Sequence, residues 1–252
     1  MPILCLLVAA VLGIVSNSMG VAAASGCILL SLWHYWAARL VILDQRLGPV
    51  RLECPGASIW LTFDDGPGPE TLSIVRILNE FECSATFFFI GEQVERYQAM
   101  PKLSAALQAG GHSVANHSYS HPNFLGLSEE NTRQEIERTQ EILSSTLPDL
   151  TLPMFRPPFG YRKRETMAVA DRLGLEVVGW SINSLDFMNG SPRQLVQRMK
   201  AQIESGKIVL FHDGRADREV TVSALPLFLQ ELKARGHRTY NPLLDVDPSP
   251  KS

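Results

Sequence analysis

Two adjacent carboxylates, Asp64 and Asp65, and two histidines four residues apart, His117 and His121, are the residues of this sequence best suited to chemistry. Two histidines and one carboxylate make a three-ligand metal site that leaves coordination positions open for water. The second carboxylate could then act as a base. The spacing of His117 and His121 would place both on one face of a helix. Taken singly, residues 64–67 could form only a turn, and the histidine pair could be incidental.

An arginine and a distant histidine complete the set of groups that metal-assisted hydrolysis needs. Arg156 stands before two prolines, and His212 comes much later in the chain. A histidine remote from the base can donate a proton to a leaving amine. Each stretch also has a simpler interpretation, since residues 156–160 could be a stiff loop and residues 212–214 another turn.

Short apolar runs predict strands, and apolar side chains at helical spacing predict helices between them. The predicted strands cover residues 58–63, 85–90, 113–116, 152–155, 175–180, 207–211 and, weakly, 238–240. The predicted helices cover residues 71–81, a segment ending before Gly110, a segment starting at Ser128, and residues 164–173, 192–205 and 226–235. This alternation predicts a parallel α/β fold of six or seven units, either closed as a barrel or open as a doubly wound sheet.

The candidate residues stand at or just beyond the carboxyl ends of the predicted strands. Those that directly follow a strand are Asp64, His117, Arg156 and His212, and Asp186 follows one by a few positions. In parallel α/β folds this edge of the sheet carries the active site. The topology would therefore bring side chains that are far apart in the sequence to one place.

The composition limits the class of protein. The 252 residues are 45% hydrophobic and 19% charged, which is too apolar for a disordered chain. A formal net charge of -3 shows no basic excess, so we expect no nucleic-acid partner. Four cysteines do not make a disulfide-stapled miniprotein. Cys54 and Cys83 lie near the starts of presumed neighbouring strands and could form a disulfide or remain as two buried thiols.

The N-terminal part of the chain is apolar, and we expect it to form a helical leader. No Lys, Arg, Asp or Glu occurs before Arg39, and we interpret residues 1–43 as a membrane anchor, built as one helix or as a tight pair of helices. The alternatives are a cleaved signal with small residues at Ala22 and Ala24, a lipid attached at Cys27, or an apolar helix packed on the body.

The leader sets the expected domain organisation and location. We expect a catalytic domain at residues 44–244 and a frayed tail at residues 245–252. A membrane-associated protein with an extracytoplasmic catalytic domain is expected, although arginines that follow the leader would favour a cytoplasmic flank. Nothing in the sequence indicates whether the protein is a monomer or an oligomer.

Four stretches of the sequence resemble, in order, motifs of the polysaccharide deacetylases, which are also called NodB-homology or carbohydrate esterase family 4 enzymes. These stretches are Thr-Phe-Asp-Asp-Gly-Pro at 62–67, His-Ser-Tyr-Ser-His at 117–121, Arg-Pro-Pro-Phe-Gly at 156–160 and Leu-Phe-His-Asp at 210–213. The resemblance implies a distorted (β/α)7, TIM-like barrel. It also implies a divalent metal, zinc in the first place with cobalt or nickel as options, and removal of N-acetyl groups from an amino-sugar polymer such as a chitooligosaccharide or peptidoglycan.

The resemblance assigns roles to the chemical residues. It implies that Asp65, His117 and His121 hold the metal, that Asp64 is the general base, and that His212 is the general acid. Bound zinc would lower the pKa of a water molecule to about 7, and the base would take its proton.

The resemblance also implies supporting roles around the reacting acetamide. Arg156 matches the residue that orients the base. The backbone N–H of Phe159, where the family often has Tyr, would help to hold the oxyanion. Leu210 would line the pocket for the acetyl methyl group.

The fourth motif of the family departs from its usual form here. The family commonly shows Asp, two residues, Asp and Trp, whereas this chain has Asn183, Asp186 and Phe187 at those positions. Asp186 remains available to brace a neighbouring cation, either Arg156 or His212. The loss of one charge and of the indole ring bears on acceptor shape and on tuning of the proton donor.

Two other functions compete with glycan N-deacetylation. One is hydrolysis of a different N-acyl group, such as a formyl group on a lipid-linked sugar, which a membrane leader would suit. The other is a glycan-binding barrel that has lost catalysis, against which Asp64, Arg156 and His212 all argue. The expected partners are an N-acetylated glycan and, through the leader, a membrane.

Overall fold

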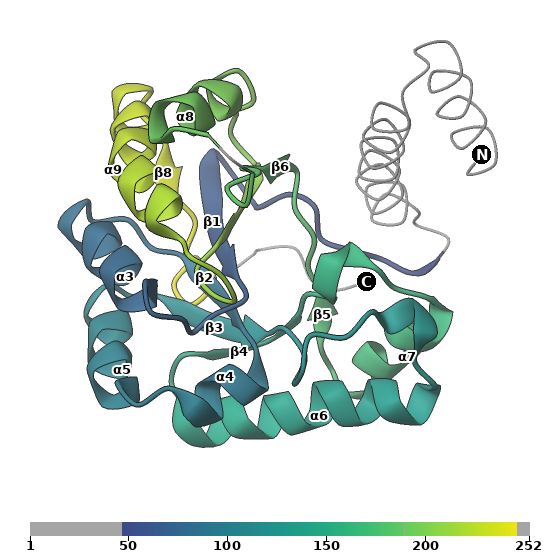
Figure 1. Ribbon diagram of the computed structural model, residues 1–252. Helices are drawn as coiled ribbons and strands as arrows, with labels where there is room; N and C mark the ends of the chain where they lie inside the picture. The colour runs from purple at the N-terminus through teal and green to yellow at the C-terminus, as the bar shows by residue number, and fades with distance from the viewer. Residues whose placement is uncertain (1–46, 189, 246–252) are drawn as a thin grey trace, which may run out of the picture.

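The computed structural model describes residues 47–188 and 190–245, and Figure 1 shows their arrangement. The predictions for the leader at residues 1–43 and for nearly all of the tail lie outside the described residues. Within the described part, no helix is both long enough and apolar enough to span a bilayer.

The centre of the molecule is a curled, parallel sheet. Its strands are β1 (Ser58–Asp64), β2 (Thr86–Phe89), β3 (Ser113–Asn116), β4 (Thr151–Phe155), β5 (Glu176–Val177), β6 (Ile182–Asn183), β7 (Ile208–His212) and β8 (Arg238–Thr239). Seven of them follow the order β5-β4-β3-β2-β1-β7-β6, and β8 pairs with the start of β1. All the pairs between these strands are parallel, so their carboxyl ends meet at one edge.

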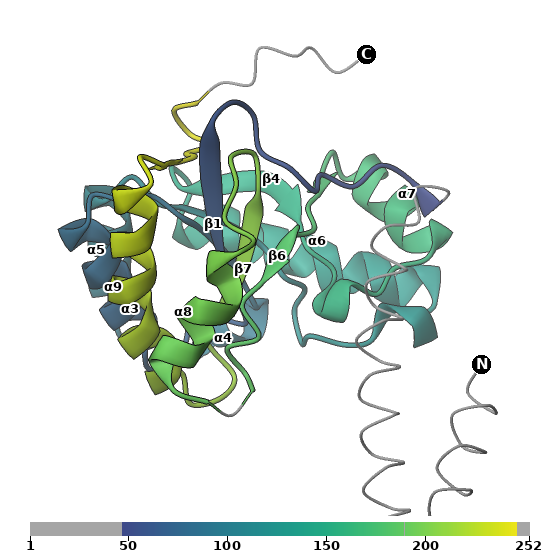
Figure 2. The same cartoon turned by 90° about the horizontal axis from the view of Figure 1, so that it is seen from above.

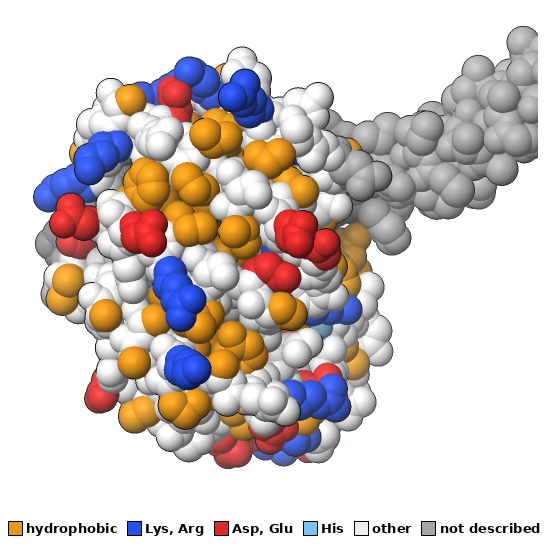
Figure 3. All heavy atoms as spheres, turned by 60° about the vertical axis from the view of Figure 1, so that its left-hand side comes forward, with side chains coloured by type: hydrophobic (Ala, Val, Ile, Leu, Met, Phe, Trp, Pro, Cys, Tyr) orange, Lys and Arg blue, Asp and Glu red, His pale blue; other side chains and the backbone are white. Residues whose placement is uncertain are grey.

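Helices surround the sheet, as the two views in Figures 1 and 2 show. They are α3 (Thr71–Glu80), α4 (Gly91–Arg96), α5 (Met100–Ala109), α6 (Glu129–Thr146), α7 (Arg164–Arg172), α8 (Pro192–Lys200) and α9 (Glu219–Ala234), with 3₁₀ turns at Phe124–Gly126 and Pro158–Gly160. The fold is a distorted (β/α)7 barrel, which confirms the fold class. On the face in Figure 3, acidic and basic side chains are interspersed with apolar ones.

Alternation along β1 sets which residues face the helices and which face the interior of the curled sheet. Ile59, Leu61 and Phe63 belong to the cluster that packs against the helices. Trp60 belongs to a second, smaller cluster. Because side chains alternate along a strand, Asp64 at the end of β1 shares the inner face with Trp60.

Several element boundaries differ from the sequence predictions. Helix α9 begins at Glu219 and contains Pro226 in its interior, whereas the sequence predicted a helix starting at that proline. The prediction was wrong because burial of the apolar face that includes Leu225 and Phe228 outweighs the local effect of the proline. Helix α8 ends at Lys200, and the short elements α4 and β6 were not predicted.

The two described cysteines are free thiols, so the alternative of a disulfide between them is wrong. Cys54 is buried, and Cys83 is partly buried. The Cys54 thiol donates to the carbonyl of Ser58 over 3.2 Å. Burial raises the pKa of the Cys54 thiol to about 11, so it stays protonated at neutral pH.

Candidate active site

The end of β1 places two carboxylates at the mouth of the barrel. Asp64 is the last residue of the strand and is buried on its inner face. Asp65 follows with φ of 76°, in the left-handed region, so the chain turns sharply at this point. The turn lets both adjacent carboxylates reach the same site, although neighbouring residues in an extended strand point to opposite faces.

The loop after β3 brings His117 and His121 together without a helix. Their ring centroids are 5.0 Å apart. The prediction that they share a helical face was wrong: Ser118 and His121 have φ of 66° and 59°. The Asn116 side chain accepts a hydrogen bond from the Ser118 amide over 2.9 Å, which stabilises a turn. Pro122 also disfavours the helical conformation at the residue before it, His121.

Asp65, His117 and His121 form a cluster that could hold a metal ion. One ligand atom from each lies within 4.8 Å of the others. Asp65 Oδ1 is 3.5 Å from His117 Nε2 and 3.0 Å from His121 Nε2. The Nδ1 atom of His117 donates to the carbonyl of Arg156 over 2.7 Å, which leaves Nε2 as the lone-pair atom that faces Asp65. Such an outer hydrogen bond is typical of metal-binding histidines, so the residues fit a divalent ion.

The protonation states of the cluster also suit a metal. Burial alone would raise the pKa of Asp65, but its contacts with His117 and His121 and the charge of His212 hold it well below the ordinary value. Burial lowers the pKa of His121, which favours its neutral imidazole. A carboxylate and a neutral imidazole are the forms in which these side chains bind metals.

Arg156 is fully buried and fixes the carboxylate of Asp64. Its Nη1 donates to Asp64 Oδ1 over 2.7 Å and to Thr62 Oγ1 over 2.9 Å. Its remaining donors reach the carbonyls of residues 178–179. The other oxygen of Asp64 lies 3.8 Å from His117 Nε2, so this oxygen faces the metal cluster.

The partly buried His212 and the buried Asp186 form a second charged pair of the site. His212 donates to Asp186 through Nδ1 over 2.7 Å and through its backbone amide over 2.8 Å. Thr221 Oγ1 donates to the same carboxylate over 2.8 Å. The sequence left open whether Asp186 braces Arg156 or His212, and the structure pairs it with His212.

The charge of His212 follows from this pairing. Burial alone would lower its pKa, but the charge and hydrogen bond of Asp186, with smaller contributions from Asp65 and Asp64, raise the pKa of His212 to about 9. The pKa of Asp186 is lowered in turn, against its burial. At neutral pH His212 is therefore an imidazolium that holds a proton on Nε2.

The three predicted substrate-side residues lie around these groups. The Phe159 ring is 51% exposed and its centroid is 4.6 Å from that of His121, while Phe187 is 55% exposed and 5.7 Å from His212. Leu210 is buried on β7, two residues before His212, and therefore on the same face of the strand. Two exposed aromatic rings thus flank the histidines of the site, one on each side.

The altered fourth motif forms a turn. The Asn183 side chain accepts a hydrogen bond from the Leu185 amide over 2.9 Å, and Leu185 has φ of 54°. Asn183 thus shapes the segment that carries Asp186 and Phe187.

Asp213 is a buried residue of the site to which the sequence assigned no role, although it ends the motif at residues 210–213. Its side chain is fully buried, and Oδ2 lies 2.5 Å from Thr71 Oγ1. Burial and the charges of Asp65 and Asp64 raise the pKa of Asp213 to about 8, despite the Thr71 contact. The sequence signal was its place in that motif, directly after His212.

Two arginines near the metal cluster were also missed. Arg218 Nη2 lies 3.5 Å from Asp65 Oδ2, and Arg215 Nη1 contacts His121 Nδ1. Both come from the segment between β7 and α9, beyond the turn that the sequence allowed at residues 212–214. Arginines that follow a strand by several residues are common, so the sequence carried no specific signal for them.

Comparisons with known proteins agree with this geometry. The family model for polysaccharide deacetylases matches residues 52–178, a range that contains the metal cluster, Asp64 and Arg156. A chitooligosaccharide deacetylase of Azorhizobium caulinodans is 32% identical over 71% of this chain and 90% of its own length. A peptidoglycan-N-acetylglucosamine deacetylase of Bacillus cereus is 34% identical over 79% of this chain and 94% of its own length.

Solved structures show the same relationship. A family 4 carbohydrate esterase from Streptomyces lividans, solved in complex with acetate, has a TM-score of 0.66 and 31% identity, covering 74% of this chain and 93% of that one. A family 4 pseudoenzyme from Bacillus anthracis has a TM-score of 0.66 and 27% identity, covering 75% of this chain and 65% of that one. With this fold, these motifs and these relatives, the chain belongs to the polysaccharide deacetylase family.

Proposed function

We propose that this protein is a divalent-metal-dependent hydrolase that removes N-acetyl groups from an amino-sugar polymer or oligosaccharide resembling a chitooligosaccharide or peptidoglycan. The observation that carries the proposal is the clustering of ligand atoms from Asp65, His117 and His121 within 4.8 Å of one another, beside the buried base Asp64. The relatives named for chitooligosaccharide and peptidoglycan deacetylation support this substrate class.

Asp65, His117 and His121 would hold the ion. A divalent ion bound there would supply Lewis-acid polarisation of the acetamide carbonyl and of a water molecule. Imidazole and carboxylate ligands suit zinc, and cobalt or nickel could occupy the same donor set. The hydrogen bond from His117 Nδ1 to the Arg156 carbonyl orients the first histidine for this task.

Asp64 acts as the general base for the attacking water. Arg156 donates to one carboxylate oxygen, which holds Asp64 in position and leaves the other oxygen free to take the proton. The water oxygen bonds to the acetamide carbon, and the backbone N–H of Phe159 helps to hold the oxyanion. Removal of one donor of this kind typically costs about 3 kcal/mol of transition-state stabilisation. Leu210 lines the space for the acetyl methyl group.

His212 acts as the general acid. The carbon–nitrogen bond breaks only when the nitrogen is protonated, since an amide anion is a very poor leaving group. With its pKa raised to about 9 by Asp186, His212 carries that proton at neutral pH. The products are acetate and a free amino sugar. Phe187, beside His212, lies where it would contact the sugar acceptor.

Acetate release from N-acetylglucosamine oligomers and from peptidoglycan fragments tests the proposal. The purified protein is measured metal-free and after reloading with zinc, cobalt or nickel. We expect release only in the loaded protein, and full release after metal loss has been verified would overturn the proposal. Release of formate alone from an N-formyl, lipid-linked sugar would point to a deformylase. Glycan binding without release of acetate or formate would point to a glycan-binding barrel that has lost catalysis.

The proposed location rests on the composition of the leader. We propose that residues 1–43 anchor the protein in a membrane and that the domain at residues 44–244 lies outside the cytoplasm. The support is the absence of Lys, Arg, Asp and Glu before Arg39. Cell fractionation with protease added outside spheroplasts tests this, because a domain protected from the protease would contradict it.

A further inference from the structure

The loop between His117 and His121 does not hold its shape through secondary structure. Ser118 and His121 have φ of 66° and 59°, a region that residues with a side chain adopt at a cost. The positions of the two histidine rings depend on the peptide groups between them. Contacts from outside the loop must therefore fix these peptide groups if the ligands are to be held in place before a metal arrives.

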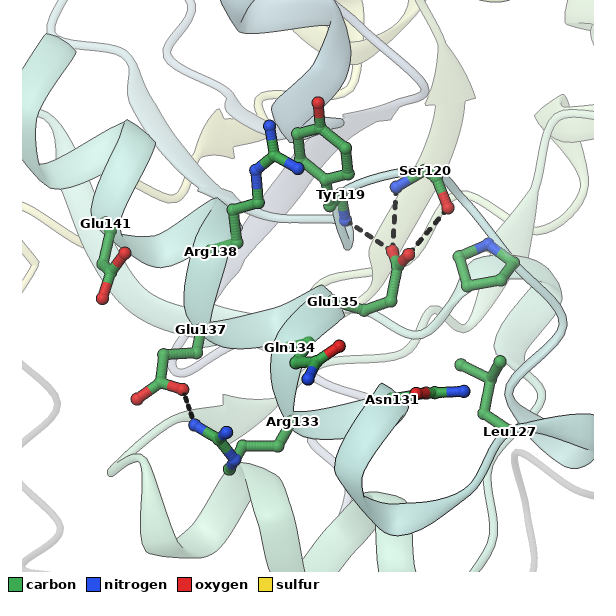
Figure 4. A pocket seen from close by; sticks show the side chains of 11 residues that line it. Tyr119, Ser120, Leu127, Asn131, Arg133, Gln134, Glu135, Glu137, Arg138 and Glu141 are labelled. Carbon is green, nitrogen blue, oxygen red and sulfur yellow. Dashed lines mark hydrogen bonds and ion pairs between the residues drawn. The ribbon is translucent and has the colours of Figure 1, made fainter.

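One side of the loop is held by a carboxylate on α6. Glu135 Oε2 accepts hydrogen bonds from the Tyr119 amide over 2.9 Å and from the Ser120 amide over 2.8 Å. Glu135 Oε1 accepts from Ser120 Oγ over 2.7 Å, and Figure 4 shows the three bonds converging on this side chain. Hydrogen bonds to an ionised acceptor are stronger than neutral ones. Among the described ion pairs none involves Glu135, so its carboxylate is committed to the loop.

The opposite side of the loop is held by the start of α4. The amide of Gly91 donates to the Ser118 carbonyl and the amide of Glu92 to the Tyr119 carbonyl, each over 3.0 Å. The first amides of a helix have no partner within the helix, so they are available for this. A Cβ atom at Gly91 would lie 2.9 Å from Tyr119 Cδ2, so glycine permits the close approach.

These contacts hold two successive peptide groups from both sides. The described peptide bonds are trans here, and in a trans peptide the carbonyl and the amide point in opposite directions. The group joining Ser118 to Tyr119 is bound through its carbonyl by α4 and through its amide by Glu135, and so is the group joining Tyr119 to Ser120. We infer that Glu135 is a positioning residue of the metal site, which it serves by clamping the segment between His117 and His121.

The inference rests on the proposed metal site and can be separated from it. Glu135→Gln keeps the size of the side chain but replaces one acceptor oxygen with an NH2 group, which faces N–H or O–H donors of the loop. Glu141→Gln is the matched control. Glu141 lies on the same helix and lines the same surface pocket as Glu135 (Figure 4), is exposed and forms no described ion pair. Both variants lose one negative charge.

Zinc affinity of the full-length protein is measured by competition with a chelating indicator. We expect about tenfold weaker zinc binding in Glu135→Gln, the lower end of the effect of partners that orient metal ligands, and no change in Glu141→Gln. Hydrogen exchange of the Tyr119 and Ser120 amides in the metal-free protein should accelerate in Glu135→Gln alone. Unchanged zinc affinity or unchanged exchange in a folded Glu135→Gln protein overturns the inference.

A second variant covers the case in which Glu135→Gln does not fold. Ser120→Ala removes one of the three hydrogen bonds to Glu135 and keeps both amide bonds, so zinc binding should weaken a few-fold. Unchanged affinity in this variant would overturn the inference. If the wild-type protein binds neither zinc, cobalt nor nickel, the proposed function fails, whereas the exchange measurement on metal-free protein still decides whether Glu135 clamps the loop.

Discussion

Replacement of Asp186 by Asn should remove the charge that keeps His212 protonated. The Asp186 carboxylate accepts three hydrogen bonds, from the Nδ1 and the backbone amide of His212 and from Thr221 Oγ1. An Asn side chain has nearly the same shape but no charge, and its NH2 group meets a donor on one side. We therefore expect a folded protein that is less stable by about 1–3 kcal/mol, the cost of one mismatched buried polar group.

The effect on His212 can be worked out from its surroundings. Burial is the largest influence on its pKa and acts downward, while Asp186 is the main group that raises the pKa to about 9. Without that charge the pKa of His212 should fall to the ordinary value of about 6.5 or below. The imidazolium would thereby lose about 3 kcal/mol of stabilisation relative to the neutral imidazole. At pH 8 the protonated fraction would fall from about 0.9 to about 0.03, so a step that needs the proton should slow by roughly 30-fold.

The assay has two parts. Nuclear magnetic resonance titration of the His212 imidazole in metal-free protein should show the fall in pKa directly. In the metal-loaded enzyme, the alkaline limb of the kcat/KM profile should move to lower pH by a similar amount, because a bound ion acts on wild type and variant alike. Activity should largely recover below pH 6, where His212 is protonated again.

A remote variant provides the control for the charge change. Asp171→Asn loses the same charge on an exposed part of α7. It should leave the alkaline limb of the kcat/KM profile at the same pH as in the wild type. A uniform loss of activity at every pH in Asp186→Asn would show that this carboxylate sets geometry alone. An unmoved alkaline limb with normal activity would refute the role of His212 as the acid.

Three other substitutions test separate parts of the site. Asp64→Asn should still bind zinc but release little acetate, and a normal rate in this variant would exclude Asp64 as the base. Asp213 holds its proton in the folded protein up to about pH 8 but loses it near 3.8 when unfolded, so wild-type stability should fall as pH rises through that window. Asp213→Asn should lack this decline in urea unfolding measured from pH 4 to 8. A Cβ at Gly214 would lie 2.1 Å from the Asp65 carbonyl, so Gly214→Ala should lower the melting temperature and weaken zinc binding, as calorimetry can show.

The strands that carry the site could be predicted from the sequence because they are short, apolar and bounded by clear turn signals. The strand predicted at residues 113–116 has the same bounds in the structure, and the run of aromatic residues in β2 is fully buried. The prediction for helix α9 is wrong because Pro226 is a common signal for a helix start, whereas tertiary packing decides where that helix begins. Elements of two residues such as β6 carry too little pattern to be recognised.

The positions of the site residues could be predicted from topology, but the contacts that tune them could not. A parallel sheet places Asp64, His117 and His212 at one edge whatever the loops do. Which cation Asp186 braces depends on the turn at Asn183, and a loop conformation with residues at positive φ leaves little trace in the sequence. Glu135 lies on a helix with many charged side chains, so its spacing gives no hint of a contact with the histidine loop.

The segments after β1 and β7 explain why the metal side and the acid side of this site form one unit. The amide of Asp213 donates to the Asp64 carbonyl over 2.9 Å. This bond joins the residue that follows His212, the proposed acid, to Asp64, the proposed base. A Cβ at Gly66 would lie 2.1 Å from Asp213 Oδ2, so the backbone beside Asp65 rests on that buried carboxyl group. Because side chains at Gly66 or Gly214 would force these segments apart, the glycines that read as mere turn signals instead permit their contact. A shift of the end of β7, which carries His212, must therefore move Asp65 as well, so the positions of the metal ligand and of the proton donor are coupled.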